Sequence, residues 1–131
     1  YGGYSQVDQL QNTTGFNGDV KESVIGIKYA IGSFTAGYQQ SDEDNGKSTG
    51  TTGYDNTAYG ITFNVNDNLS VGYSHVESDG TGASVDPEAD SFQIAYTMGG
   101  ASIRIAEVDV DNASYAAGST DATIVSLGLA F

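Results

Sequence analysis

The sequence predicts an all-β fold, with about eight antiparallel strands in up-and-down order. Two observations carry this prediction. Segments almost free of charge alternate apolar residues with small or polar ones at a period of two, which is typical of β-strands. Charged residues are instead gathered in four stretches, at 7–22, 41–55, 77–90 and 107–121. The 131 residues have room for one unit, so we treat 1–131 as a single segment.

The alternation places the strands in order along the chain. We expect them near residues 1–6, 21–31, 34–41, 54–65, 69–78, 90–98, 101–109 and 121–131. One face of each strand is apolar and often aromatic, and this face includes Ile25, Ile27, Tyr29 and Ile31; Tyr59, Ile61, Phe63 and Val65; Leu69, Val71 and Tyr73; Phe92, Ile94, Tyr96 and Met98; Ile103 and Ile105; and Val125, Leu127, Leu129 and Phe131. The opposite face carries mostly Gly, Ala, Ser, Thr, Asn and Gln.

Long and short connections follow one another in strict rotation. The short ones are Gly32–Ser33, Asn66–Asp67–Asn68 and Gly99–Gly100, whose residue types favour tight hairpin turns. The long ones are the acidic stretches. All short turns should therefore lie at one end of the sheet and all long loops at the other.

Composition excludes several classes of function. With 4 Lys plus Arg against 17 Asp plus Glu, the net charge is −13, which argues against a nucleic-acid partner. The absence of Cys excludes disulfides and thiolate sites. No GxSxG, HExxH or phosphate-loop pattern occurs, and the single histidine, His75, has no catalytic companion in the sequence. We therefore expect a protein that is not an enzyme and has no resident cofactor.

The two faces predict a membrane environment. A soluble half-buried strand would present Lys, Glu and Arg to solvent, but the small polar face carries almost none, with Lys28 and Arg104 as exceptions. Aromatic residues near the strand ends suit the interfacial girdles of outer-membrane barrels, which also have long extracellular loops and short periplasmic turns. Exposed strand edges are not tolerated in hydrocarbon, so the sheet must close. We predict a transmembrane antiparallel up-and-down β-barrel in a bacterial outer membrane, in contact with the lipid bilayer and lipopolysaccharide.

Longer segments resemble a known family. ESVIGIKYAIGSFTAGYQQSD, NTAYGITFNVNDNLSVGYSHVES and SFQIAYTMGGASIRIAEVDVDN with TIVSLGLAF are similar to the C-terminal half of the general diffusion porins of alpha-proteobacteria. The similarity is greatest from Gly99 to Phe131. It implies a trimer of 16-stranded barrels, each with a water-filled channel for passive diffusion of small hydrophilic solutes and ions. It implies no catalysis.

The size of the barrel is open to two interpretations. A complete porin of that family is more than twice as long as this chain, so the chain is either part of a larger barrel or closes alone with eight strands. The lumen of an eight-stranded barrel is filled by side chains, and the small inward residues would underfill it. We therefore expect about half of a 16-stranded barrel. The alternatives are a small eight-stranded barrel acting as an adhesin or structural anchor, and a soluble or filament-forming calcium-binding β-protein.

Two sets of residues are candidates for function. The candidates for the pore lining are Lys28, Arg104, Gln93, Thr62 and Asn64, all on predicted inward faces. The two cations either bias the field of a pore or neutralise carboxylates on its wall. The candidates for a weak calcium site are Asp42, Asp44, Glu107, Asp109 and Asp111, because calcium is bound by six to eight oxygen ligands. The alternative for the acidic residues is a solvated loop.

Overall fold

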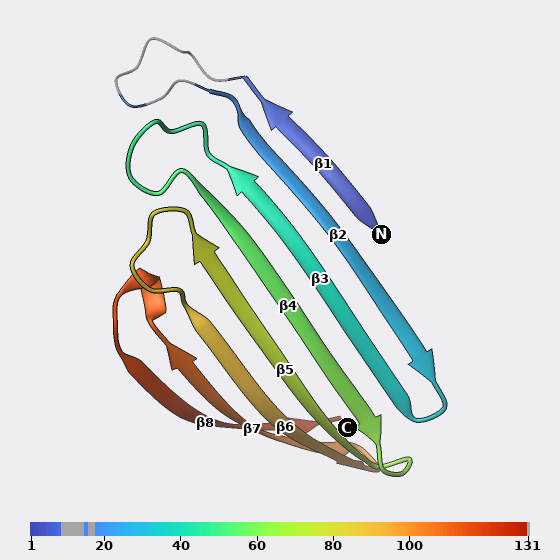
Figure 1. The fold of residues 1–131 in the computed structure, drawn as a ribbon. Coiled ribbons are helices and arrows are strands. Elements are labelled where there is room, and N and C mark those ends of the chain that lie inside the picture. Colours follow the sequence, from blue (N-terminus) through green and yellow to red (C-terminus); the bar gives the residue numbers. More distant parts are fainter. Residues whose placement is uncertain (9–14, 16–17, 131) are drawn as a thin grey trace.

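The computed structural model describes residues 1–8, 15 and 18–130, and they form one eight-stranded antiparallel sheet (Figure 1). The strands are β1 (Gly2–Val7), β2 (Val20–Ile31), β3 (Phe34–Asp44), β4 (Gly53–Asn64), β5 (Leu69–Gly80), β6 (Glu88–Met98), β7 (Ala101–Asp111) and β8 (Ser119–Leu129). A 3₁₀ turn, η1 (Ala113–Tyr115), precedes β8. Each strand pairs with its neighbours in sequence. The predicted all-β class, strand number and strand order are confirmed.

Short turns and long loops lie at opposite ends of the sheet (Figure 1). The β2–β3 and β6–β7 turns contain Gly32 at φ 55° and Gly99 at φ 58°. These values fall in the left-handed region, where a Cβ is disfavoured, so glycine has a steric reason to stand there. The rotation of short and long connections is therefore confirmed.

Several strands extend further into the acidic stretches than expected. β3 reaches Asp44, β5 reaches Gly80 and β7 reaches Asp111, each a few residues beyond the predicted end. The backbone pairs continue there because a charged side chain at the end of a strand still reaches water. Residues 131 and 9–14, with 16–17, lie outside the described part, so the terminal aromatic of the predicted last strand cannot be placed.

Like charges face one another across this acidic end. Asp55 on β4 is the register partner of Asp42 on β3 and of Asp79 on β5. On β6–β8, and on the same face, Asp109 pairs with both Asp90 and Asp121. Like charges placed directly opposite on paired strands repel one another and destabilise the pairing.

The two faces separate as the alternation predicts. In one register row, Lys28 pairs with Gly37 and Gly37 pairs with Gly60, while the next row joins apolar residues on the other face. We call the small polar side the inward face and the apolar side the outward face. The outward face is open: Ile27 is 68% exposed and Leu127 is 70% exposed. Within the described residues, the one buried apolar side chain is Ala106, so this single layer has no hydrophobic core.

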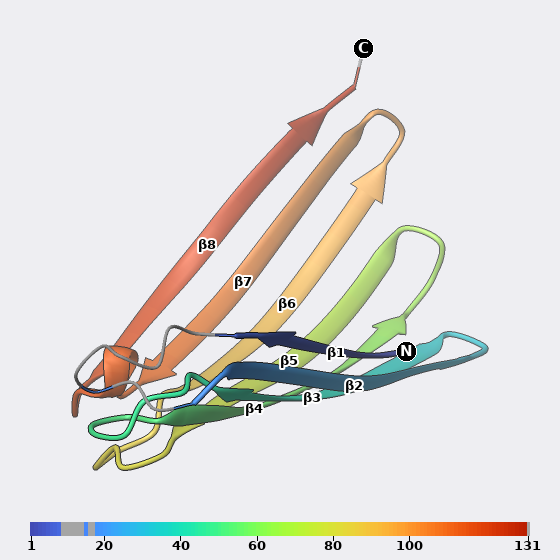
Figure 2. The same ribbon diagram turned by 90° about the horizontal axis from the view of Figure 1, so that it is seen from above.

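The sheet curves but does not close. Figure 2 shows β5–β8 standing at a steep angle to β2–β4, with β1 and β8 at separate edges. The alternative in which these eight strands close on themselves is therefore not what the structure contains. The small inward residues give a physical reason, since they would leave a narrow barrel underfilled.

Replacing Gly32 tests the first turn. Gly32→Val should lower the free energy of unfolding by roughly 1–2 kcal/mol, because a β-branched residue is strained at positive φ. Gly32→Asn is the matched control and should cost less, since asparagine tolerates this region. Urea unfolding curves of the folded protein measure both, and equal losses would contradict the assigned turn geometry.

Candidate functional site

A hollow of about 620 Å³ lies against β2–β7, and most of the residues that line it belong to the inward face. Its floor is made of register rows of small residues, because Gly60 pairs with Gly37 and Ser74, and Gly72 pairs with Thr62 and Gln93. Glycine, serine and threonine have short side chains that project little from the sheet. The curvature of the sheet therefore leaves space over its inward face. The hollow is therefore a consequence of residue size on one parity of the strands.

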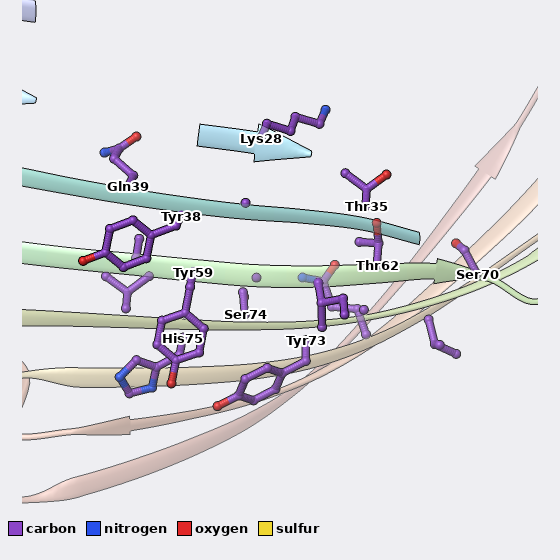
Figure 3. Close-up of a pocket in the computed structure, with 18 of the residues that line it drawn as sticks. Lys28, Thr35, Tyr38, Gln39, Tyr59, Thr62, Ser70, Tyr73, Ser74 and His75 are labelled. Carbon is purple, nitrogen blue, oxygen red and sulfur yellow. The ribbon is translucent and has the colours of Figure 1, made fainter. Parts of the chain in front are cut away.

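Figure 3 shows that side chains from the two faces of the sheet point in opposite directions near this hollow. Lys28, Thr35 and Ser74 project to one side of the strands, whereas Tyr59, Tyr73 and His75 project to the other. Residues of both sets border the hollow. The polar group and the aromatic group are thus separated by the thickness of one sheet.

Lys28 and Arg104 both line the hollow, from β2 and β7. Both side chains are exposed. Across residues 1–8, 15 and 18–130, neither takes part in an ion pair or a hydrogen bond, and the one ion pair present involves His75 instead. The interpretation that they neutralise carboxylates on the wall therefore receives no support from this geometry. Their positive field is free to act on the hollow.

The other three pore-lining candidates divide between two places. Thr62 and Gln93 line the same hollow, on either side of Gly72. Asn64 lies elsewhere, in a smaller hollow at the short turns, where its backbone amide donates to the Ser33 carbonyl at 2.9 Å. Its position at the end of β4 explains the difference, because the main hollow lies towards the middle of the strands.

Two residues that the sequence did not single out also shape the hollow. Tyr1 lies across the inward face, and its hydroxyl donates to Gln39 Oε1 at 2.5 Å. A Cβ at Gly26 would lie 2.3 Å from the Tyr1 ring, so a larger residue there would displace that ring. An isolated glycine at an inward position of a strand is the signal that points to such a close approach.

A polar cluster occupies the outward face where the apolar residues end. His75 Nδ1 lies 2.9 Å from Asp90 Oδ1, and the Tyr73 hydroxyl donates to the same carboxylate. The rings of Tyr59 and His75 stack with centroids 4.9 Å apart. These contacts pair Nδ1 of His75 and the hydroxyl of Tyr73 with the Asp90 carboxylate beside apolar neighbours. They assign His75 a position at the boundary between the apolar and acidic parts of the outward face.

The calcium candidates do not come together. Asp42 and Asp44 stand on β3, whereas Glu107, Asp109 and Asp111 stand on β7, with three strands between them. Asp44 accepts a hydrogen bond from the Gly46 amide, and Glu107 accepts one from Thr123 at 2.8 Å. No group of three or more metal-binding side chains forms within the described part of the chain. The two sets are therefore separate candidates, and in the described residues neither is gathered into a metal-binding group.

The sequence also missed a polar ladder on the inward face. Ser78 Oγ donates to Asn56 Oδ1 at 2.5 Å, and Asn56 Nδ2 donates to Ser41 Oγ at 3.4 Å. These residues are direct register partners on β5, β4 and β3. They lie towards the long loops. Pairing between inward polar residues is visible only once the register is known.

No family model matches the chain, and neither a curated protein nor a solved structure matches it. Among the described residues, no helix has the length and apolar character needed to span a membrane.

Proposed function

We propose that this chain forms part of the wall of an outer-membrane porin. In this proposal the channel is a water-filled barrel of 16 strands, assembled as a homotrimer, through which small hydrophilic solutes and ions diffuse passively. The outward face contacts lipid and lipopolysaccharide, and the inward face lines the water. The proposed activity is passive transport, with no chemical change of the solute.

The exposed outward face is the observation that carries the proposal. Large apolar side chains cover it from β2 to β8, and Ile27, Val125 and Leu127 are each more than half exposed. Contiguous apolar patches beyond a few hundred Å² are rare on soluble monomers and mark contact surfaces. The wall of a barrel in lipid needs an apolar outer face and an inner face of polar residues, which is the arrangement of this sheet.

The boundary of the apolar band adds a second argument. One register row crosses the seven long strands, and its outward residues are Ile27, Tyr38, Tyr59, His75, Asp90, Asp109 and Asp121. The row is apolar on β2 and acidic on β8. Barrel strands tilt by about 35–45°, so a plane normal to the barrel axis crosses neighbouring strands roughly one residue apart. An apolar belt that steps along the strands is what this tilt requires.

The short turns step in the same direction as the boundary. The β2–β3 hairpin ends at the pair Ile31–Phe34, and the same row reaches Ile94–Ile105 on β6 and β7. The β6–β7 hairpin continues past that row to Met98. Both limits of the belt therefore shift together, which keeps its height similar across the sheet.

The edges of the sheet indicate where more wall belongs. β1 and β8 each pair on one side only. In hydrocarbon an unpaired strand edge leaves backbone donors and acceptors unsatisfied at a cost of several kcal/mol per group. Further antiparallel strands that join these two edges would satisfy them, which is the role the proposal gives to the other half of the barrel.

Conductance in planar bilayers tests the function. The purified protein should insert in detergent-dilution experiments and produce stable, ohmic steps of current. Silent but stable insertion would favour the small anchor, and solubility without detergent would remove the membrane proposal altogether. A liposome-swelling assay with small sugars gives the independent readout for uncharged solutes.

A charge at Ile94 tests the outward assignment. Ile94→Arg should lower the free energy of unfolding of the protein in vesicles by about 2–4 kcal/mol, the cost of arginine near the bilayer midplane. Gln93→Arg is the matched control, because residue 93 points into the hollow. Folding titrations measured by gel mobility should separate the two variants. Equal stabilities would contradict the assignment of faces.

The unpaired cations should influence ion selectivity. Replacing Lys28 and Arg104 together by Gln removes the positive charges of the hollow, so the ratio of anion to cation permeability should fall. The reversal potential across a KCl gradient measures this ratio. Lys21→Gln removes one positive charge from the outward face of β2, so it is the control for each single replacement and should leave the ratio nearly unchanged. The lumen assignment fails if the double variant keeps the parent's reversal potential.

A further inference from the structure

The connection between β7 and β8 does not extend away from the sheet. Its tyrosine, Tyr115, reaches back to β5, where its hydroxyl lies 2.7 Å from Ser78 Oγ. Its ring also lies 5.5 Å from the ring of Tyr54 on β4. Since β6 stands between β5 and β7, the segment 112–118 crosses the end of β6. Ser78 and Tyr54 both have inward parity, so this crossing lies on the inward face.

Polar groups on three strands hold the tyrosine in place. The Ser78 hydroxyl gives its proton to Asn56 Oδ1, so the Tyr115 hydroxyl is the donor to Ser78. Asn56 in turn donates to Ser41. The phenol of Tyr115 therefore completes a chain of hydrogen bonds that runs across β5, β4 and β3. A serine with one proton accepts readily in this position.

The ring itself occupies a fitted seat. A Cβ at Gly80 would lie 2.7 Å from Tyr115 Cε1, so the ring rests where any other residue would place a side chain. Gly80 is buried and Tyr115 is half-buried. We call the contact surface formed by Tyr54, Ser78 and Gly80 the tyrosine seat.

The backbone of the segment is unusual and is fixed by separate contacts. Asn112, Ser114 and Tyr115 have φ values of 53°, 59° and 58°. Asparagine tolerates this region, but serine and tyrosine rarely occupy it, so surrounding contacts must hold them there. The Asn112 side chain donates to the Asp86 carbonyl at 3.0 Å, and its amide donates to the Gly118 carbonyl. The segment 112–118 is therefore held at Asn112 by these hydrogen bonds and at Tyr115 by the contact with Ser78.

We propose that residues 112–118 form a fixed constriction at the long-loop mouth of the channel, and that Tyr115 sets the size of solute that can enter. The inference rests on the proposed porin function and deepens it. The segment occupies space on the inward face beside the register row of Val76, Ala89, Val110 and Thr120. A solute entering along β4–β6 must pass this segment, so its position limits the open cross-section.

Channel recordings test the constriction. Tyr115→Ala removes the phenol and ring from the seat, so single-channel conductance should rise and the size limit for poly(ethylene glycol) exclusion should shift to larger polymers. Tyr115→Phe keeps the ring and removes only the hydrogen bond, so it should fall between the parent and Tyr115→Ala. Tyr29→Ala on the outward face of β2 is the control and should leave both measurements at the parent values.

Thiol labelling tests the seat without requiring a channel. The chain contains no cysteine, so Ser78→Cys introduces one reporter beneath Tyr115. Its labelling rate with a water-soluble maleimide in the folded protein should rise at least several-fold when Tyr115→Ala is added. Ser91→Cys, also inward but outside the seat, is the control whose rate should not change.

The two experiments separate the possible failures. A Ser78→Cys rate that is indifferent to residue 115 overturns the seat. A responsive rate together with unchanged conductance and size limit in Tyr115→Ala overturns the constriction while leaving the porin function standing. A parent protein without conductance overturns the porin function itself, and the labelling result still decides whether the seat exists.

Discussion

Inter-strand register is the constraint on which the rest of this sheet depends. Once Lys28 pairs with Gly37 and Gly37 with Gly60, every neighbouring residue is committed to one face or the other. A slip of one residue would send Ile27 and its partners into the hollow and leave the small residues outside. The short turns at Gly32 and Gly99 fix this register locally. Face, hollow and exposed apolar band then follow without a second layer of structure.

Because the sheet has no core, its apolar face is exposed rather than buried against a second layer. In a soluble sandwich the apolar side chains of two sheets bury one another, and the polar side meets water. Here the apolar side chains on β2 and β8 remain exposed, and the described residues bury only Ala106 among apolar side chains. The free energy that would stabilise this sheet must therefore come from backbone pairing and from whatever medium covers the outward face. The oblique belt and the unpaired edges are consistent with the same requirement.

Local patterns were enough to predict much of the fold. The alternation of Ile25, Ile27 and Tyr29 with small residues depends only on neighbours in sequence, so strands, faces and turns could be read directly. The ends of β3 and β5 could not, because charge was taken as the mark of a loop whereas backbone pairing continues through Asp44 and Gly80. At the site, Lys28, Arg104, Thr62 and Gln93 were found by parity alone. Tyr115 was missed because its seat joins residues 37 positions apart in sequence, a relation that no periodicity contains.

The facing carboxylates at Asp42, Asp55 and Asp79 make the two ends of the sheet differ in stability. Hairpins that begin at glycine turns can zip outward from one end, with pairing partners already close in sequence. Repulsion between these carboxylates weakens the pairing at the acidic ends of the strands, and dissolved counterions reduce that repulsion by screening. The end of the sheet with the short turns is therefore insensitive to salt, whereas the stability of the end with the long loops depends on ionic strength.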